Sequence, residues 1–179
     1  MNNEQRVNLL NLCQFSPADI KWRLIYRASD NGFDASDFHS CCDCFENTLT
    51  IIKSSNGFIF GGYASKAWNT NDFWISDENS FLFSLCNKQN YPLKLKCTDP
   101  KHALFNSPTC GPVFGYNRST NGFDLCIKSG ANMNINSHSN LGVSFSNPLL
   151  KYGLDHDKSF LAGSYTFQVL DIEVYCIIN

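Results

Sequence analysis

The sequence predicts a mainly β domain (α+β by content), built as a two-sheet antiparallel β-sandwich with short helices at its periphery. Three observations point to this fold class. Apolar and polar residues alternate in several short segments, as in strands with one buried face. The pair Asn56-Gly57 separates two such segments, and this pair is typical of a β-hairpin turn. The C-terminal segment changes its apolar parity once, which indicates a bent final strand.

Length and charge limit the functional classes. The chain has 179 residues, enough for one domain with a substantial core. Its formal net charge is −2, and it lacks the basic stripe with which proteins bind nucleic acid. No apolar run approaches the ~18 residues of a membrane span, and the N-terminus does not resemble a signal peptide. We therefore expect a cytoplasmic, monomeric protein with no nucleic-acid partner and no direct membrane insertion.

Two helices are predicted before the first hairpin. Ser16-Pro17 has the residue types of an N-cap and a first helical position. The apolar residues that follow, as far as Tyr26, fit one broad face of a helix. Asn31-Gly32 should end this helix, and Asp34 should begin a short second one.

The N-terminal residues stand apart in composition. Residues 1–15 are polar except for a small apolar patch. They are expected to form a tail or an extra helix, so the main domain is assigned to residues 16–179.

The hairpin at Asn56-Gly57 has an unusual partner strand. A two-residue type I′ turn would pair Ile52 with Gly61 and Ile51 with Gly62. Because glycine has no side chain, both faces of the hairpin leave room there for a close neighbour. We expect an aromatic ring or the second sheet, not a ligand, to fill this space.

Later segments predict more strands and one bend. Alternating residues predict strands that begin near Phe81, Leu93 and Phe123. Apolar residues then occupy odd positions up to Val169 and even positions from Leu170. Since side chains alternate between the faces of a strand, this change requires a β-bulge or break near these two residues. We expect the final strand to bend there and to cross between two sheets.

The nine cysteines are expected to be reduced thiols, because the number is odd and the chain is not short. Cys86, Cys126 and Cys176 lie in strand-like contexts and should pack as small hydrophobic residues. The number of cysteines therefore gives no reason to expect a disulfide framework.

A denser group of cysteines lies beside His39. Cys41 and Cys44 have the spacing of a metal-binding pair, and Cys42 lies between them. No second Cys or His pair completes a tetrahedral zinc site, so we expect no metal and no cofactor. A redox-active thiol among these three cysteines is the alternative. The neighbouring acidic residues would raise the thiol pKa values and disfavour it.

Catalytic arrangements are not evident in the sequence. There is no Gly-x-Ser-x-Gly elbow and no Cys-His-Asn block. Asp171 and Glu173 share one strand face, but nothing marks the sugar-lined cleft that a carboxylate pair would need. We interpret them as an outer hydrogen-bonded face on which Glu173 anchors the backbone amides of a neighbouring loop. Asn140 and Gly142 should shape a loop with an unusual φ. The chain is therefore predicted not to be an enzyme.

Successive blocks of the chain closely resemble the TLDc domain family, in the order of the family and over nearly the whole length. The blocks are Trp22–Arg27, Gly32-Phe33, Phe38-His39, Thr48–Ser55, Gly57–Tyr63, Ser80–Leu85, Gly111-Pro112, Phe123–Ile127, Ser139–Gly142, Phe160–Gly163 and Phe167–Tyr175. The positions that match the family motifs, mainly structural ones, are Gly61, Gly62, Asp124, Asn140, Gly142, Gly163 and Glu173. The chain departs from the usual pattern at residues 41–46.

The resemblance implies a two-sheet sandwich with flanking helices and no established catalytic activity. It also implies a link to oxidative-stress resistance and binding to peripheral subunits of the vacuolar proton pump, the V-ATPase. Recruitment to endolysosomal or vacuolar membranes would then occur through that partner. The expected function is a non-catalytic protein-interaction domain. Two alternatives stay open: a thiol-based antioxidant or redox sensor that uses Cys41, Cys42 or Cys44, and an adaptor with an unrelated partner.

Overall fold

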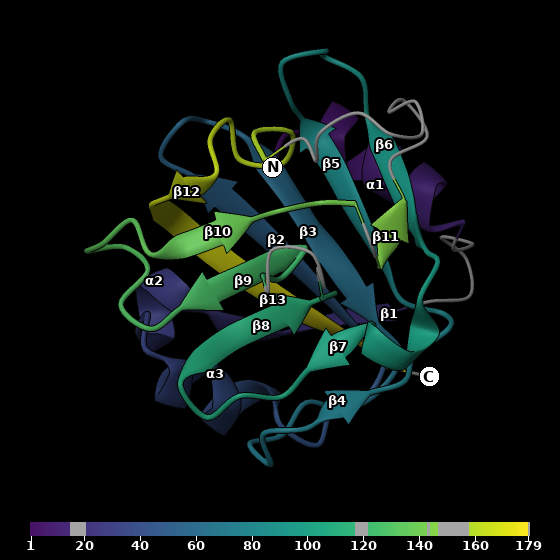
Figure 1. Cartoon of the computed structure of the whole chain (residues 1–179). Helices are drawn as coiled ribbons and strands as arrows, with labels where there is room; N and C mark the ends of the chain where they lie inside the picture. The colour runs from purple at the N-terminus through teal and green to yellow at the C-terminus, as the bar shows by residue number, and fades with distance from the viewer. Residues whose placement is uncertain (15–20, 117–121, 143, 147–157, 179) are drawn as a thin grey trace.

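The computed structural model describes residues 1–14, 21–116, 122–142, 144–146 and 158–178. The described residues form two antiparallel sheets that face one another, with helices packed around them (Figure 1). This arrangement confirms the predicted mainly β sandwich. No helix among the described residues is long and apolar enough to cross a membrane.

The larger sheet has seven strands, and it contains both the first strand of the chain and the last one. In spatial order they are β1 (Lys21–Arg27), β13 (Val169–Ile178), β2 (Thr48–Ser54), β3 (Ile59–Ala64), β5 (Phe81–Cys86), β6 (Leu93–Cys97) and β11 (Phe145–Ser146). The six-stranded sheet follows the order β12 (Thr166–Phe167), β10 (Ser137–Ser139), β9 (Leu125–Lys128), β8 (Cys110–Phe114), β7 (Leu104–Phe105) and β4 (Trp74–Ile75). The helices are α1 (Asn3–Cys13), α2 (Ala28–Asn31), α3 (Ala35–Cys42) and the 3₁₀ helix η1 (Pro100–His102).

The space between the sheets is filled by aromatic rings. Phe60 of the larger sheet and Phe167 of the smaller one meet edge to face, with centroids 5.4 Å apart. Trp68 contacts Phe114 in the same way and donates its indole N–H to Thr48 Oγ1 at 2.9 Å. The buried polar atom of Trp68 is thus satisfied, as a close-packed core requires.

The helix predicted to run up to Tyr26 is wrong. Lys21–Arg27 is instead the strand β1, at the edge of the larger sheet, where it pairs with β13. The predicted cap Ser16-Pro17 lies outside the described residues. Edge strands expose much of both faces, so this segment does not alternate clearly, and pairing with a strand about 150 residues away decides its structure.

The helical prediction does hold for the residues that follow. The short helix α2 ends at Gly32, whose φ is +113°. Asp34 then caps α3, and its side chain and that of Asp37 form a reciprocal capping box. The N-terminal residues form an extra helix, α1, in which Leu9 and Cys13 are buried.

The predicted register of the hairpin is wrong by one residue. Ile51 pairs with Gly61, and Ile52 with Phe60. The loop has three residues, because the N–H of Ser54 donates to the carbonyl of Phe58 at 3.0 Å. Gly57 adopts a φ of +82°, as in a type I turn closed by a left-handed glycine. The prediction assumed a type I′ turn, whose loop has two residues, and the third loop residue shifts the register by one.

The two glycines of β3 do admit close neighbours, as expected. A Cβ built on Gly62 would lie 2.6 Å from the ring of Phe114, which belongs to the opposite sheet. A Cβ on Gly61 would overlap the carbonyl oxygen of Thr50 and lie 2.9 Å from the ring of Phe83. Aromatic rings therefore fill both faces, and the prediction of aromatic packing is confirmed.

The bend in the final strand is also confirmed. Phe167 belongs to the six-stranded sheet through β12, whereas Val169 begins β13 of the other sheet. The register of β13 against β2 shifts between Val169 and Asp171, so Leu170 forms a bulge and is 51% exposed. The C-terminal segment therefore joins the two layers of the sandwich.

Candidate functional site

An open groove lies on the outer face of the seven-stranded sheet, beside α1. It has a volume of about 470 Å³. Apolar residues and a few charged ones line it: Met1, Arg6, Leu9, Leu10, Cys13, Trp22, Arg27, Leu49, Ile51, Glu173 and Tyr175. A small second hollow continues along β13 and shares Met1, Ile51 and Glu173 with the first.

The position of α1 explains why the groove exists. This helix contacts β5 and β6, and Leu9 and Cys13 pack with the buried residues of the outer face. In Figure 1, α1 lies behind these two strands. Among the described residues, no helix covers the strands β2, β13 and β1 beside α1, and side chains of these strands form the floor of the groove. The groove is therefore a product of the N-terminal helix and three distant strands.

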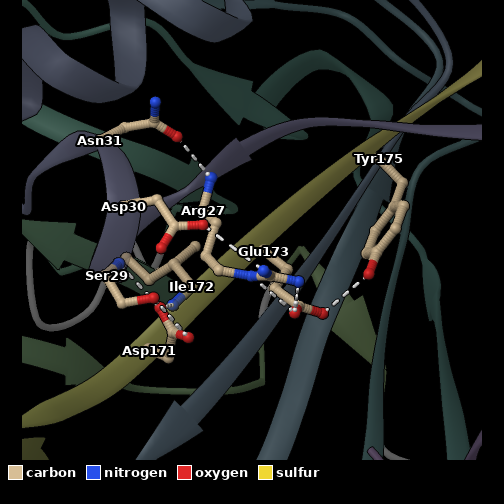
Figure 2. A network of polar contacts seen from close by, with 8 residues as sticks. All are labelled: Arg27, Ser29, Asp30, Asn31, Asp171, Ile172, Glu173 and Tyr175. Atoms are coloured by element: carbon tan, nitrogen blue, oxygen red, sulfur yellow. Dashed lines mark hydrogen bonds and ion pairs between the residues drawn. The ribbon is translucent and has the colours of Figure 1, made fainter.

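Charged residues form a fixed network at the edge of the groove (Figure 2). Arg27 donates from both Nε and Nη2 to Glu173 Oε1, at 3.1 and 2.9 Å. Tyr175 donates its hydroxyl to the other carboxylate oxygen of Glu173 at 2.9 Å. Arg27 also contacts Asp30 at 3.4 Å. Glu173 is thus held from both sides, with Arg27 and Tyr175 in defined positions along the groove.

The electrostatics of this network follow from its hydrogen bonds. The hydrogen bond and charge of Glu173 raise the pKa of Arg27. Partial burial raises the pKa of Tyr175, and the hydrogen bond to Glu173 adds to the rise. The phenol is therefore neutral and the guanidinium charged near pH 7. Since the ion pair is accessible to solvent, it orients side chains more than it stabilises the fold.

Asp171 has the role that was expected of Glu173. Its carboxylate accepts the backbone N–H of Ser29 at 3.1 Å and the Ser29 hydroxyl at 3.2 Å. The prediction that Glu173 anchors loop amides is wrong, because Glu173 binds side chains. The register explains the difference: Arg27 pairs with Glu173, so Ser29, two residues further on, lies beside Asp171.

Asp124 organises a loop between β10 and β11. Its buried carboxylate accepts the backbone N–H groups of Gly142 at 2.8 Å and Ser144 at 3.1 Å. Its own carbonyl accepts the N–H of Asn140 at 3.1 Å. Gly142 has a φ of +136°, as predicted, whereas Asn140 is not among the residues with positive φ. These residues build the loop, which lies apart from the groove.

Gly163, like the two glycines of β3, lies against an aromatic ring. Its φ is +85°, and a Cβ there would lie 2.8 Å from the ring of Phe58.

Of the sequence-predicted motif residues, only Glu173 lines the groove. The sequence did not predict that the groove residues come together, because no local pattern shows that α1 lies over this sheet.

Comparison with known proteins assigns the family. A family model described as the TLDc domain matches residues 1–178. The chain belongs to the TLDc family. The match includes α1 as well as the sandwich.

This TLDc domain is also similar to parts of longer proteins. It is 32% identical over 96 residues to the MTOR-associated protein MEAK7 of Xenopus laevis, which covers 48% of this chain and 20% of that protein. It is 35% identical over 74 residues to the protein of the same name from Gallus gallus, covering 38% and 15% respectively. The chain therefore spans a fifth or less of the length of these relatives.

The cysteines near His39 are brought together but have different surroundings. Burial raises the pKa of the Cys42 thiol, and Asp43 adds to the rise. Cys44 is exposed and Cys41 half-buried. His39 is buried, with Nδ1 2.7 Å from Asp43 Oδ1 and Nε2 2.9 Å from the carbonyl of Ser107. This histidine therefore links α3 to the segment before β8.

Metal binding has no visible basis in this part of the chain. Across the ranges that the structure describes, no group of three or more His, Cys, Asp or Glu side chains could hold a metal ion. All nine cysteines lie in those ranges as free thiols.

A second thiol group was missed by sequence reasoning. Cys110 and Cys126 lie on neighbouring strands with their sulfur atoms 3.9 Å apart, and Lys128 Nζ is 3.3 Å from Cys110 Sγ. Cys126 and Lys128 are two residues apart in one strand, so they share a face. The approach of Cys110 depends on the irregular register of β8 against β9, which the sequence does not reveal.

Proposed function

We propose that this TLDc domain is a non-catalytic protein-interaction module that binds its partner through the groove beside α1. The observation that carries the proposal is an open groove with an apolar floor and a fixed charged edge. Trp, Tyr and Arg are enriched among the residues that dominate binding energies at interfaces. Trp22, Tyr175 and Arg27 line this groove together. Their side chains would give a partner both an apolar anchor and charged groups that set its orientation.

The first candidate partner is the peripheral, catalytic sector of a V-ATPase. Membership of the TLDc family and the resemblance of the motif blocks support this choice. A domain bound there would alter the assembly or the activity of the pump, and would reach endolysosomal or vacuolar membranes through it. The link to oxidative-stress resistance would then be indirect, through the pump.

A second candidate is a complex that contains MTOR. It is favoured by the names of the relatives, which are MTOR-associated proteins. The shared segments fall within this domain, so the domain itself would carry the association. The same groove serves both candidates, and recovery of the partner decides between them.

Affinity purification of the tagged full-length gene product from its own cells tests the function. We expect Trp22→Ala and Arg6→Glu each to reduce recovery of the partner by about tenfold or more, since truncation of a central contact costs more than about 1.4 kcal/mol. The matched controls are Phe73→Ala and Lys66→Glu. Phe73 is 69% exposed, and neither control residue lines the groove. The readout is the amount of pump subunits or of MTOR in the eluate.

The possible outcomes separate function from site. If the wild-type protein recovers neither pump subunits nor MTOR under any redox or nutrient condition, the result argues against the function. Recovery that is equal for groove variants and controls argues against the groove alone. Circular dichroism of each variant shows that a loss of binding is not a loss of folding.

A further inference from the structure

A small cluster of side chains on the outer face of the six-stranded sheet has no role in the proposed interaction. Cys110, Val113 and Cys126 are buried together, apart from the main core, and Phe105 and Phe123 pack against them. Cys110 begins β8, directly after the exposed residue Thr109. The cluster therefore lies one layer below the surface.

The two cysteines are close enough to react with one another. Their sulfur atoms are 3.9 Å apart, and a disulfide bond requires about 2.05 Å. The register of β8 against β9 shifts between Cys110 and Val113, so the cysteines sit diagonally across neighbouring strands. A relative movement of the two sulfur atoms of about 2 Å would bring them into bonding distance.

The surroundings make the two thiols chemically different. Cys126 donates its S–H to Cys110, and the Lys128 ammonium lies 3.3 Å from the same sulfur. The hydrogen bond from Cys126, with the charge of Lys128, lowers the pKa of Cys110 to about 5. The pKa of Cys126 is raised well above its usual value, because its proton is held in that hydrogen bond. Cys110 is thus the more acidic of the two sulfurs, and Cys126 holds its proton more tightly.

We propose that Cys110 and Cys126 form a reversible intramolecular disulfide when the domain meets a small hydroperoxide. Cys110 is the attacking sulfur and Cys126 the resolving one. This inference does not depend on partner binding. It also concerns different cysteines from the group beside His39, in which Cys42 has a raised pKa.

With hydrogen peroxide as the oxidant, the reaction consumes one peroxide molecule and releases two molecules of water. The Cys110 thiolate attacks one peroxide oxygen, so an S–O bond forms as the O–O bond breaks. The leaving hydroxide takes a proton from solvent, and Cys110 becomes a sulfenic acid. The sulfur of Cys126 then attacks Cys110 Sγ, the S–S bond forms, and the hydroxyl leaves with the Cys126 proton as water. Two electrons pass from the two sulfurs to the peroxide, and a dithiol reductant reverses the change.

Oxidation of this pair would change the surface around it. The Lys128 ammonium loses its anionic partner, and a covalent bond joins β8 to β9. The carbonyl of Cys110 also lies 3.0 Å from His39 Nε2, so the same strand end contacts α3. Exposure to an oxidant would therefore form a disulfide where the six-stranded sheet contacts α3.

The test is titration of the full chain with hydrogen peroxide, followed by alkylation and peptide mass spectrometry. We expect a peptide linked through Cys110 and Cys126 to accumulate before exposed Cys44 is modified. In Cys126→Ala the reaction should stop at a Cys110 sulfenic acid, trapped by a cyclic dione. Lys128→Met should slow oxidation of Cys110 about tenfold or more, whereas the matched control Lys66→Met should not.

Specific results would overturn the inference. One is that Cys44 or another cysteine is consumed while Cys110 and Cys126 still alkylate in the wild-type chain. Another is an unchanged oxidation rate in Lys128→Met. The wild-type measurement stands even where a variant does not fold, and the circular dichroism spectrum of each variant identifies that case.

Discussion

Gly61→Ala is expected to destabilise the domain by about 3 kcal/mol or more. The added Cβ would overlap the carbonyl oxygen of Thr50, a backbone atom of the paired strand, and press on the ring of Phe83. Overpacking in a core typically costs ~1–3 kcal/mol, and a rigid backbone atom places this change at the upper end. Urea unfolding followed by circular dichroism measures the loss. It is a large part of the ~5–15 kcal/mol that keeps a domain folded.

Gly111→Ala is the matched control for this prediction. Gly111 also lies in a buried strand, but a Cβ there would meet only ordinary contacts, the nearest being 3.7 Å from Ile127 Cγ2. Its free energy of unfolding should change by less than about 0.5 kcal/mol. Equal effects of the two substitutions would show that the close approach of β2 to Gly61 does not govern the stability of the sheet.

Asp124→Ala is expected to cost about 2–6 kcal/mol. The carboxylate accepts the N–H groups of Gly142 and Ser144, and its removal would leave both donors without their acceptor. A buried group that loses its partner costs ~1–3 kcal/mol, so two such groups account for the range. Chemical denaturation gives the free energy, and amide hydrogen exchange at Gly142 should become faster.

Two companion variants separate the causes of this loss. Asp124→Asn keeps the shape and one acceptor oxygen, so it should lose less than the alanine variant. Asp171→Ala removes another carboxylate that accepts a backbone N–H, but one that is partly exposed. Its cost should stay below about 1 kcal/mol. If Asp124→Ala proves as mild as Asp171→Ala, the buried carboxylate does not hold the loop.

Local patterns were sufficient for β2, β3, β5, β6, β9 and β13 and for the bend near Leu170. Side chains in a strand alternate strictly, so the change of parity at Val169–Leu170 has few structural explanations. Capping residues likewise identified the start of α3 at Asp34. Both features are decided by residues that are adjacent in the chain, so they can be predicted from the sequence alone.

Other features depended on distant partners. The apolar residues of Lys21–Arg27 fit a helix. The segment is nevertheless a strand, because it pairs with β13, which lies at the other end of the chain. The hairpin register depended on whether Gly57 closes a two-residue or a three-residue loop, and Asn-Gly is compatible with both. A local pattern cannot choose between alternatives that have similar local free energies.

The sequence by itself determined the sandwich, the family likeness and the packing role of the glycines in β3, because periodicity and missing side chains are local properties. The tertiary structure alone decided the groove and the thiol pair. The groove needs α1 to lie over β5 and β6 while β1, β13 and β2 stay open. The thiol pair needs an irregular register that brings Cys110 within 3.9 Å of Cys126. Both arise from contacts between segments far apart in the chain, which only the packed fold brings together.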